Sequence, residues 1–251
     1  MRKALHILVP LAAAAVPLAM ATAAHAEGTS YQATLDPLNH SGGSGMATVT
    51  LTGNTADIDV SWSGLASTFG GNPYPHVQHI HIGGQGTCPT PAADTNGDGV
   101  ISTTEGGPAY GGIGTTLSVK GDTSPAAGTN IKIAPSGDST DYHRTITLDD
   151  KTLASLKSGT GVVVVHGLDP ATLSKQAQNE KSDLVKSLPL AATSPALCGA
   201  LTAMPAGGVA AGAGTTAGIE DAGLLAAGGG LVAGAAGLAL YAVRRRQAAE
   251  A

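Results

Sequence analysis

Aromatic side chains are scarce in this chain of 251 residues, of which phenylalanine, tyrosine and tryptophan make up only 3%. Trp62 is the only tryptophan and Phe69 is the only phenylalanine. A hydrophobic core must therefore be built mainly from valine, isoleucine, leucine and alanine.

Positive charge is missing from the first half of the chain after residue 26. Residues 27–119 contain seven carboxylates and no lysine or arginine. Across residues 27–205 there are 15 acidic and 8 basic side chains, which leaves a net charge of −7. An acidic surface argues against nucleic acid or an anionic lipid surface as a partner, because both are polyanions.

Charge of either sign is absent from residues 222–243, a run of 22 residues near the C-terminus. At about 1.5 Å rise per residue, a helix of this length can cross a bilayer. Arg244, Arg245 and Arg246 follow directly, and the positive-inside rule keeps residues 244–251 in the cytoplasm. We therefore predict a single-pass anchor that leaves the preceding domain outside the cell.

The N-terminus has the organisation of a secretory signal peptide. Arg2 and Lys3 precede a largely apolar run that ends in Ala24-His25-Ala26, the small-x-small pattern that signal peptidase cleaves. We predict a signal peptide at 1–26 and a folded domain at 27–203. Residues 204–221, rich in proline, alanine, glycine and threonine, cannot bury a core and are predicted to form a flexible stalk.

Only two cysteines occur, Cys88 and Cys198. Thiols oxidise in exported domains, so we predict one disulfide between them. A role as soft metal ligands is the alternative, but the two cysteines lack the CxxC spacing of such sites.

Short stretches of alternating polar and apolar residues, separated by Gly, Pro, Asn and Asp, dominate the domain. This pattern is typical of an all-β sandwich or barrel of about eight strands. The expected strands are 31–35, 45–51, 56–62, 76–82, 116–120, 129–133, 143–148 and 161–166. Helices are expected only at 149–156 and 172–188.

Two histidines stand two residues apart in one expected strand, in the sequence His79-Ile80-His81. Because side chains alternate along a strand, both imidazoles face the same side. His166 ends the apolar run Val162-Val-Val-Val165. If these two strands are neighbours, the three histidines can converge on one cation, and imidazole nitrogen suits copper or zinc.

These segments resemble the copper/zinc superoxide dismutases, a family of eight-stranded Greek-key barrels. That family takes two copper ligands from an HxH strand and a third from a histidine that follows a valine-rich strand. Its disulfide joins the loop after HxH to a late Cys-Gly. The matching segments here are His79-Ile-His-Ile-Gly-Gly-Gln-Gly-Thr-Cys88, Ile146-Thr-Leu-Asp-Asp150, Gly161-Val-Val-Val-Val-His166 and Leu197-Cys-Gly-Ala-Leu201. Residues 31–83, with Ser63-Gly-Leu65, are also similar to the CHRD domain of chordin-type proteins.

The chain departs from the dismutase pattern at several positions. No histidine occurs from residue 82 to residue 142, so the bridging histidine and the zinc histidines have no counterpart and zinc is not expected. The family's arginine would fall at Pro195. Either His76 or His143 would have to complete a copper site. Superoxide is an anion, so an acidic domain without that arginine predicts slow turnover.

A second metal motif lies in the twelve residues from Asp94 to Glu105. Oxygen-bearing side chains at loop positions 1, 3, 5, 9 and 12, with glycine at position 6, follow the EF-hand calcium pattern. The expected ligands are Asp94, Asn96, Asp98, the Val100 carbonyl, Ser102 and Glu105. Prolines before the loop and Gly106-Gly-Pro108 after it argue against flanking helices, which favours a structural calcium ion over a sensor.

The sequence thus supports two functional hypotheses. In the first, the chain is an exported, membrane-anchored domain that binds calcium and copper without efficient catalysis. In the second, it is a copper-only superoxide dismutase or another extracellular copper redox enzyme. A hydrolase is not expected, because the chain has neither GxSxG nor HExxH, and no residue is assigned a catalytic role. No protein partner is evident from the sequence.

Overall fold

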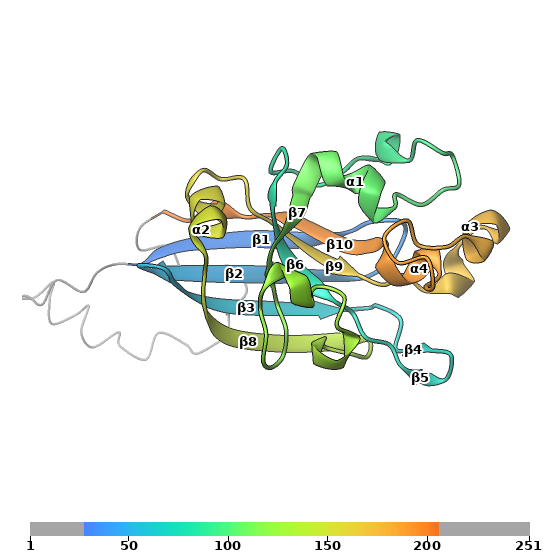
Figure 1. Cartoon of the computed structure of the whole chain (residues 1–251), viewed down its shortest axis with the longest axis horizontal. Coiled ribbons are helices and arrows are strands. Elements are labelled where there is room, and N and C mark those ends of the chain that lie inside the picture. The colour runs from blue at the N-terminus through green and yellow to red at the C-terminus, as the bar shows by residue number, and fades with distance from the viewer. Residues whose placement is uncertain (1–27, 206–251) are drawn as a thin grey trace, which may run out of the picture. The chain divides into compact units, whose positions relative to one another are not determined.

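Antiparallel strands form a large sheet in the computed structural model of the protein, which describes residues 28–205 (Figure 1). The predicted signal peptide, membrane span and cytoplasmic tail, and nearly all of the stalk, fall outside these residues. None of the helices within residues 28–205 is long and apolar enough to cross a membrane. The strands are β1 (Thr29–Pro37), β2 (Ser44–Thr52), β3 (Thr55–Ser63), β4 (Thr68–Phe69), β5 (Asn72–Pro73), β6 (Gln78–Gly83), β7 (Gly111–Thr116), β8 (Ser139–Thr147), β9 (Val162–His166), β10 (Pro195–Ala200) and β11 (Thr202–Ala203).

Helices are few and short. They are α1 (Thr103–Tyr110), α2 (Asp150–Lys157), α3 (Lys175–Asn179) and α4 (Leu190–Thr193), with single 3-10 turns η1 (Pro91–Ala93), η2 (Pro125–Ala127), η3 (Ile131–Ile133) and η4 (Pro170–Thr172). The predicted all-β fold is thereby confirmed.

One sheet holds nine of the strands, in the order β7-β6-β9-β10-β1-β2-β3-β8, with β11 beside β1. Strand β1 takes part in three ladders, because most of its length pairs with β2, Asp36 and Pro37 pair with β10, and its first half also pairs with the short β11. The sheet curls around this shared strand, and β4 and β5 form a separate small hairpin. Strands β7 and β8 lie at the two edges of this sheet. Arg144 of β8 connects the two edges, because it donates hydrogen bonds to the Ser118 carbonyl (2.7 Å) and the Gly121 carbonyl (3.3 Å) in the segment after β7.

The main core lies on the concave side of the sheet and follows from strand periodicity. In β3, Ala56, Ile58, Val60 and Trp62 are buried while the residues between them are exposed, apart from the half-buried Thr55 at the strand start. The scarce aromatic Trp62 donates its indole N–H to the Gln78 side chain at 3.0 Å, which satisfies two buried polar groups at once.

Strand β9 is buried on both faces, as its unbroken valine run predicts. Val163 and Val165 join the main core, whereas Val162 and Val164 pack in a second cluster with Tyr110 and Cys198. The second cluster also contains the predicted disulfide, which the structure confirms between Cys88 and Cys198.

Some predicted elements were wrong. The strand that was expected at 116–120 instead occupies 111–116, and the expected strand at 129–133 contains the 3-10 turn η3. Only 175–179 of the predicted helix 172–188 is α-helical. Farther along, the Ser182 hydroxyl accepts the N–H groups of Leu184 and Val185, which gives the backbone an alternative to helical bonding.

Helix α1 also corrects the expectation that no helix would flank the acidic loop. Ser102 and Glu105 form a capping box, in which Ser102 Oγ accepts the Glu105 N–H and Glu105 Oε2 accepts the Ser102 N–H. This cap starts a helix of eight residues although Pro108 lies inside it. The entry side of the loop has only the 3-10 turn η1.

Candidate metal centre

The ladder between β6 and β9 brings the predicted histidines together. Gln78 pairs with Val165 and His79 with Val164, and the Val77 carbonyl accepts the His166 N–H at 2.9 Å. Residues that pair directly share a face of the sheet, so His79, His81 and His166 all project to the side opposite the main core. Ile80 and Val163, which alternate with them, point into that core.

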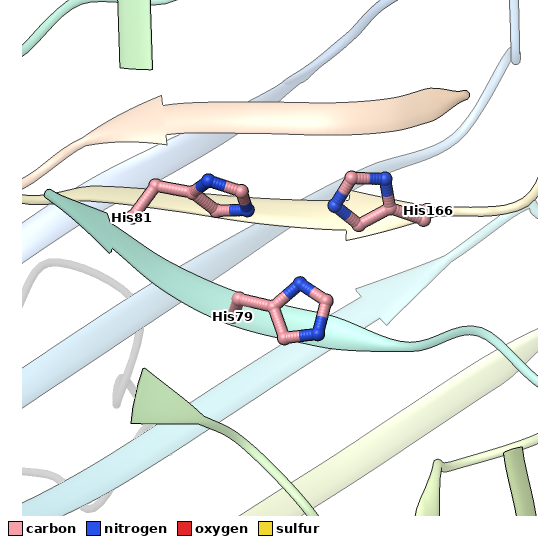
Figure 2. A group of neighbouring side chains, drawn as sticks. All are labelled: His79, His81 and His166. Carbon is pink, nitrogen blue, oxygen red and sulfur yellow. The ribbon is translucent and has the colours of Figure 1, made fainter. Parts of the chain in front are cut away.

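The three imidazoles form a nearly equilateral group. The ring centroids are 5.4 Å apart for His79 and His81, 5.2 Å for His79 and His166, and 5.7 Å for His81 and His166. Figure 2 shows the rings turned toward a common centre. One ring nitrogen from each residue lies within 4.8 Å of the others. Among the described residues, no other set of histidine, cysteine and carboxylate ligand atoms is grouped in this way.

Backbone carbonyls determine which nitrogen of each ring is available. His79 Nε2 faces the Gly128 carbonyl at 3.0 Å, His81 Nδ1 the Gly111 carbonyl at 3.0 Å, and His166 Nδ1 the Thr193 carbonyl at 2.7 Å. Because a carbonyl accepts, each of these nitrogens carries the hydrogen of a neutral imidazole. Nδ1 of His79 and Nε2 of His81 and His166 keep their lone pairs and have no hydrogen-bond partner.

Burial keeps all three rings neutral. Their exposed fractions are only 2–3%. Desolvation lowers the pKa of His79 well below its ordinary value, with further lowering by the charges of His166 and His81. It likewise lowers the pKa of His81 to about 3 and that of His166 to about 4. Since neutral imidazole is the form that binds metal, the three lone pairs are available at physiological pH.

His76 and His143 do not join the group. Both ring nitrogens of His76 face carbonyl oxygens, Nδ1 that of His166 at 3.0 Å and Nε2 that of Ala66 at 2.9 Å. Each ring nitrogen of His76 is thus blocked by a backbone carbonyl, so neither is open to a metal. His143 lies on the outer face of β8, exposed, with Nδ1 2.8 Å from an Asp59 carboxylate oxygen. The structure thus offers neither as the fourth nitrogen ligand.

A pocket of about 310 Å³ opens beside the histidines. Val77, Ile113 and Leu184 supply much of its apolar wall, and none of the described residues that line it is charged. Gly128 leaves room for this arrangement, because a Cβ there would come within 3.2 Å of His79 Nε2 and closer still to the Ile113 side chain, which would have to shift. The pocket leaves room for a small ligand next to a bound ion.

The acidic loop has a different organisation. Glu105 reaches back across the loop, where its Oε1 accepts the Thr95 N–H at 2.9 Å and the Thr95 hydroxyl at 2.8 Å. Asp94 accepts the N–H groups of Gly97 and Gly99. The carboxylate oxygens of the loop do not lie as close together as the three histidine nitrogens do. The structure therefore gives the predicted calcium ion no direct support.

Several components of the site were not predicted from the sequence. The carbonyls of Gly111, Gly128 and Thr193 come from the start of β7, the end of η2 and the end of α4, and no side-chain pattern marks them. Tyr110, whose ring lies 4.7 Å from that of His81, was also missed. The only sequence feature that marks Tyr110 is its position directly before two glycines.

No family model matches the chain. No curated protein matches it either. A solved mutant of superoxide dismutase 5 from Candida albicans is similar at 17% identity, covering 73% of this chain and 97% of that one, with a TM-score of 0.39.

Proposed function

We propose that this domain binds one copper ion through Nδ1 of His79 and Nε2 of His81 and His166. The observation that carries the proposal is the convergence of three buried lone pairs that have no hydrogen-bond donor. A buried polar atom left without a partner costs about 1–3 kcal/mol. A cation at the common centre would use all three lone pairs.

Copper fits this ligand set better than the alternatives. Imidazole nitrogen suits copper, zinc, iron and nickel, whereas calcium and magnesium take oxygen. Structural zinc sites are closed by four protein ligands, and the three side chains that converge here within the described residues exclude that kind of site, although their number also suits a catalytic zinc ion. Among divalent first-row metals, affinity for a given nitrogen site is generally highest for Cu²⁺.

Metal holding without efficient catalysis is the favoured role. No charged side chain among the described residues lines the histidine pocket, so no positive charge in its own wall draws in an anion such as superoxide. A copper-only superoxide dismutase is the alternative, and the ligand set implied by the resemblance to that family supports it. The resemblance of residues 31–83 to the CHRD domain fits either role.

Copper titration of residues 27–205 tests the site. We expect one tightly bound copper per domain in the parent and in the matched control His143→Ala, which removes an exposed histidine outside the group. His79→Ala and His166→Ala should each lose the bound ion, measured by elemental analysis after gel filtration. Unchanged copper content in both variants would refute the site.

Superoxide consumption distinguishes the two roles. The favoured role predicts that copper-loaded parent consumes superoxide no faster than copper-treated His79→Ala. A copper-dependent rate well above that of the variant would establish the dismutase alternative instead.

We also propose that loop 94–105 binds a structural calcium ion. Its spacing supports the proposal, as does the crowding of carboxylates around it. A hydrogen bond to Asp98, with smaller contributions from burial and the charges of Asp98 and Glu105, raises the pKa of Glu180. A cation would relieve this crowding. A site in an extracellular module typically has a Kd of roughly 10⁻⁴ to 10⁻³ M.

Thermal melting tests the calcium site. At a calcium concentration about 100 times Kd, the parent should gain about 2.7 kcal/mol of stability and melt at a higher temperature. Glu105→Gln should lose this response, while Asp141→Asn, which removes an exposed carboxylate on β8, should keep it. An equal response in all three proteins would show that calcium acts elsewhere.

The proposed setting is the outer face of a membrane. The signal-peptide pattern of 1–26, the uncharged run 222–243 and the arginines after it support an exported domain with a single C-terminal anchor. The metal ions are its proposed ligands, and the acidic surface argues against nucleic acid.

A further inference from the structure

A second hollow, of about 550 Å³, adjoins the histidine pocket, and we call it the apolar groove. The two share Val77, Thr129 and Thr193 in their walls. Its volume lies in the range of small-molecule sites, which is about 300–1,000 Å³. The groove differs from the histidine pocket in its aromatic lining and in carrying a charge.

Exposed apolar side chains gather at these two hollows. The large hydrophobic residues exposed in the described part of the chain are Phe69, Val119, Ile131 and Leu184. Phe69 and Ile131 line the groove, and Leu184 lines the histidine pocket. Leaving such side chains in water is unfavourable, and their concentration around a hollow marks a surface that binds something apolar.

Aromatic rings form one wall of the groove. Phe69 and Tyr74 lie with ring centroids 5.0 Å apart. The Tyr74 hydroxyl donates toward the carbonyls of Leu168 (3.1 Å) and Ala191 (3.4 Å), which fixes the ring in place. A preformed aromatic wall loses little conformational entropy when it binds a flat apolar molecule.

One positive charge stands in this lining. Lys132 follows Ile131 in η3, and no aspartate or glutamate among the described residues lines the groove. Lys132 forms no ion pair with a described residue. In a domain with a net charge of −7 over residues 27–205, a lone ammonium beside an apolar wall is complementary to one negative group.

We propose that the apolar groove binds a small aromatic carboxylate, with its ring against Phe69 and Tyr74 and its carboxylate at Lys132. The ligand would lie next to the histidine site. The proposal goes beyond metal binding and does not depend on it, because none of the three histidines lines the groove.

Binding of 2-naphthoate to residues 27–205 tests the proposal. These residues hold a continuous core and the disulfide, and cooperative melting should confirm that each variant is folded. Calorimetry of metal-free protein should give one saturable site for 2-naphthoate. The neutral analogue 2-naphthalenemethanol should bind about tenfold more weakly, the factor that corresponds to about 1.4 kcal/mol.

Matched variants locate the site. Ile131→Ser should weaken 2-naphthoate binding about tenfold, whereas Val119→Ser, at another exposed apolar residue that lies outside the groove, should not change it. Lys132→Gln should abolish the preference for the carboxylate over the alcohol, and Lys157→Gln should preserve it. The parent should bind 2-naphthoate both without metal and with copper bound. Failure of the copper proposal and failure of the groove proposal can therefore be distinguished.

Three results would overturn the proposal. They are the absence of saturable binding, equal weakening by Ile131→Ser and Val119→Ser, and sedimentation showing a dimer that Ile131→Ser dissociates. The last result would assign the groove to a second copy of the chain.

Discussion

The six histidines within residues 28–205 show how surroundings decide what one side chain does. His79, His81 and His166 each give one nitrogen to a carbonyl and keep the other free. Both ring nitrogens of His76 face carbonyl oxygens. The residue type is the same in all four, but only the first three have a ring nitrogen that is open to a metal.

His143 provides a residue-scale prediction about pH. A hydrogen bond to Asp59, followed by the charges of Asp59 and Asp57, raises the pKa of His143 above its ordinary value of 6.5. A raised folded-state pKa stabilises the protein fully below the unfolded pKa, and this contribution is lost as pH rises through the folded pKa. At about pH 5.5 we expect the parent to have a higher melting temperature than His143→Gln. This difference in melting temperature should disappear by about pH 9.

The contribution should be small, because His143 and both aspartates are well exposed and water screens the pair. Asp59→Asn serves as the control. When both proteins carry Asp59→Asn, the pH-dependent difference in melting temperature between His143 and His143→Gln should largely disappear. A melting difference that stays constant across the pH range would show that His143 acts through packing alone.

At the scale of elements, the sequence predicted the strands with clear alternation. Strands β1, β2 and β3 bury every second residue, and β9 is an unbroken valine run, so their patterns are visible without a structure. Strand β10, Pro195–Ala200, is also buried except at its last residue, but its sequence holds proline, glycine and two alanines and no β-branched residue, so no strand signal marks it. It was anticipated only as a segment that resembles the dismutase family.

The loops around the site could not be predicted, for a physical reason. The η2 turn and the segment before β10 contribute carbonyl oxygens, which every residue has, so no side-chain signal marks them. The apolar groove arises in a similar way. It combines the β4–β5 hairpin, η3 and the residues near α4, segments that are distant in sequence and meet only through the fold of the sheet.

At the scale of the whole molecule, the disulfide connects the parts that form the metal site. Cys198 lies on β10 opposite Val164 of β9, the strand that ends at His166. Cys88 belongs to the loop after β6 and packs with the cluster that contains Tyr110. Tyr110 in turn contacts the His81 ring. The cross-link therefore ties the HxH strand and the third histidine's strand into one unit.

This arrangement leads to a prediction about global stability. The disulfide joins residues 110 apart in sequence. In the chain-entropy model, closing a loop of this length stabilises the folded state by roughly 4 to 5 kcal/mol. Reduction of residues 27–205 should therefore lower the free energy of unfolding by about that amount, measured by urea denaturation. The Cys88→Ser/Cys198→Ser double variant should unfold as the reduced parent does, and adding reductant to it should change nothing. If the reduced parent and the oxidised parent unfold at the same urea concentration, the hydrophobic cluster around Tyr110 and Val164 holds these strands together without the cross-link.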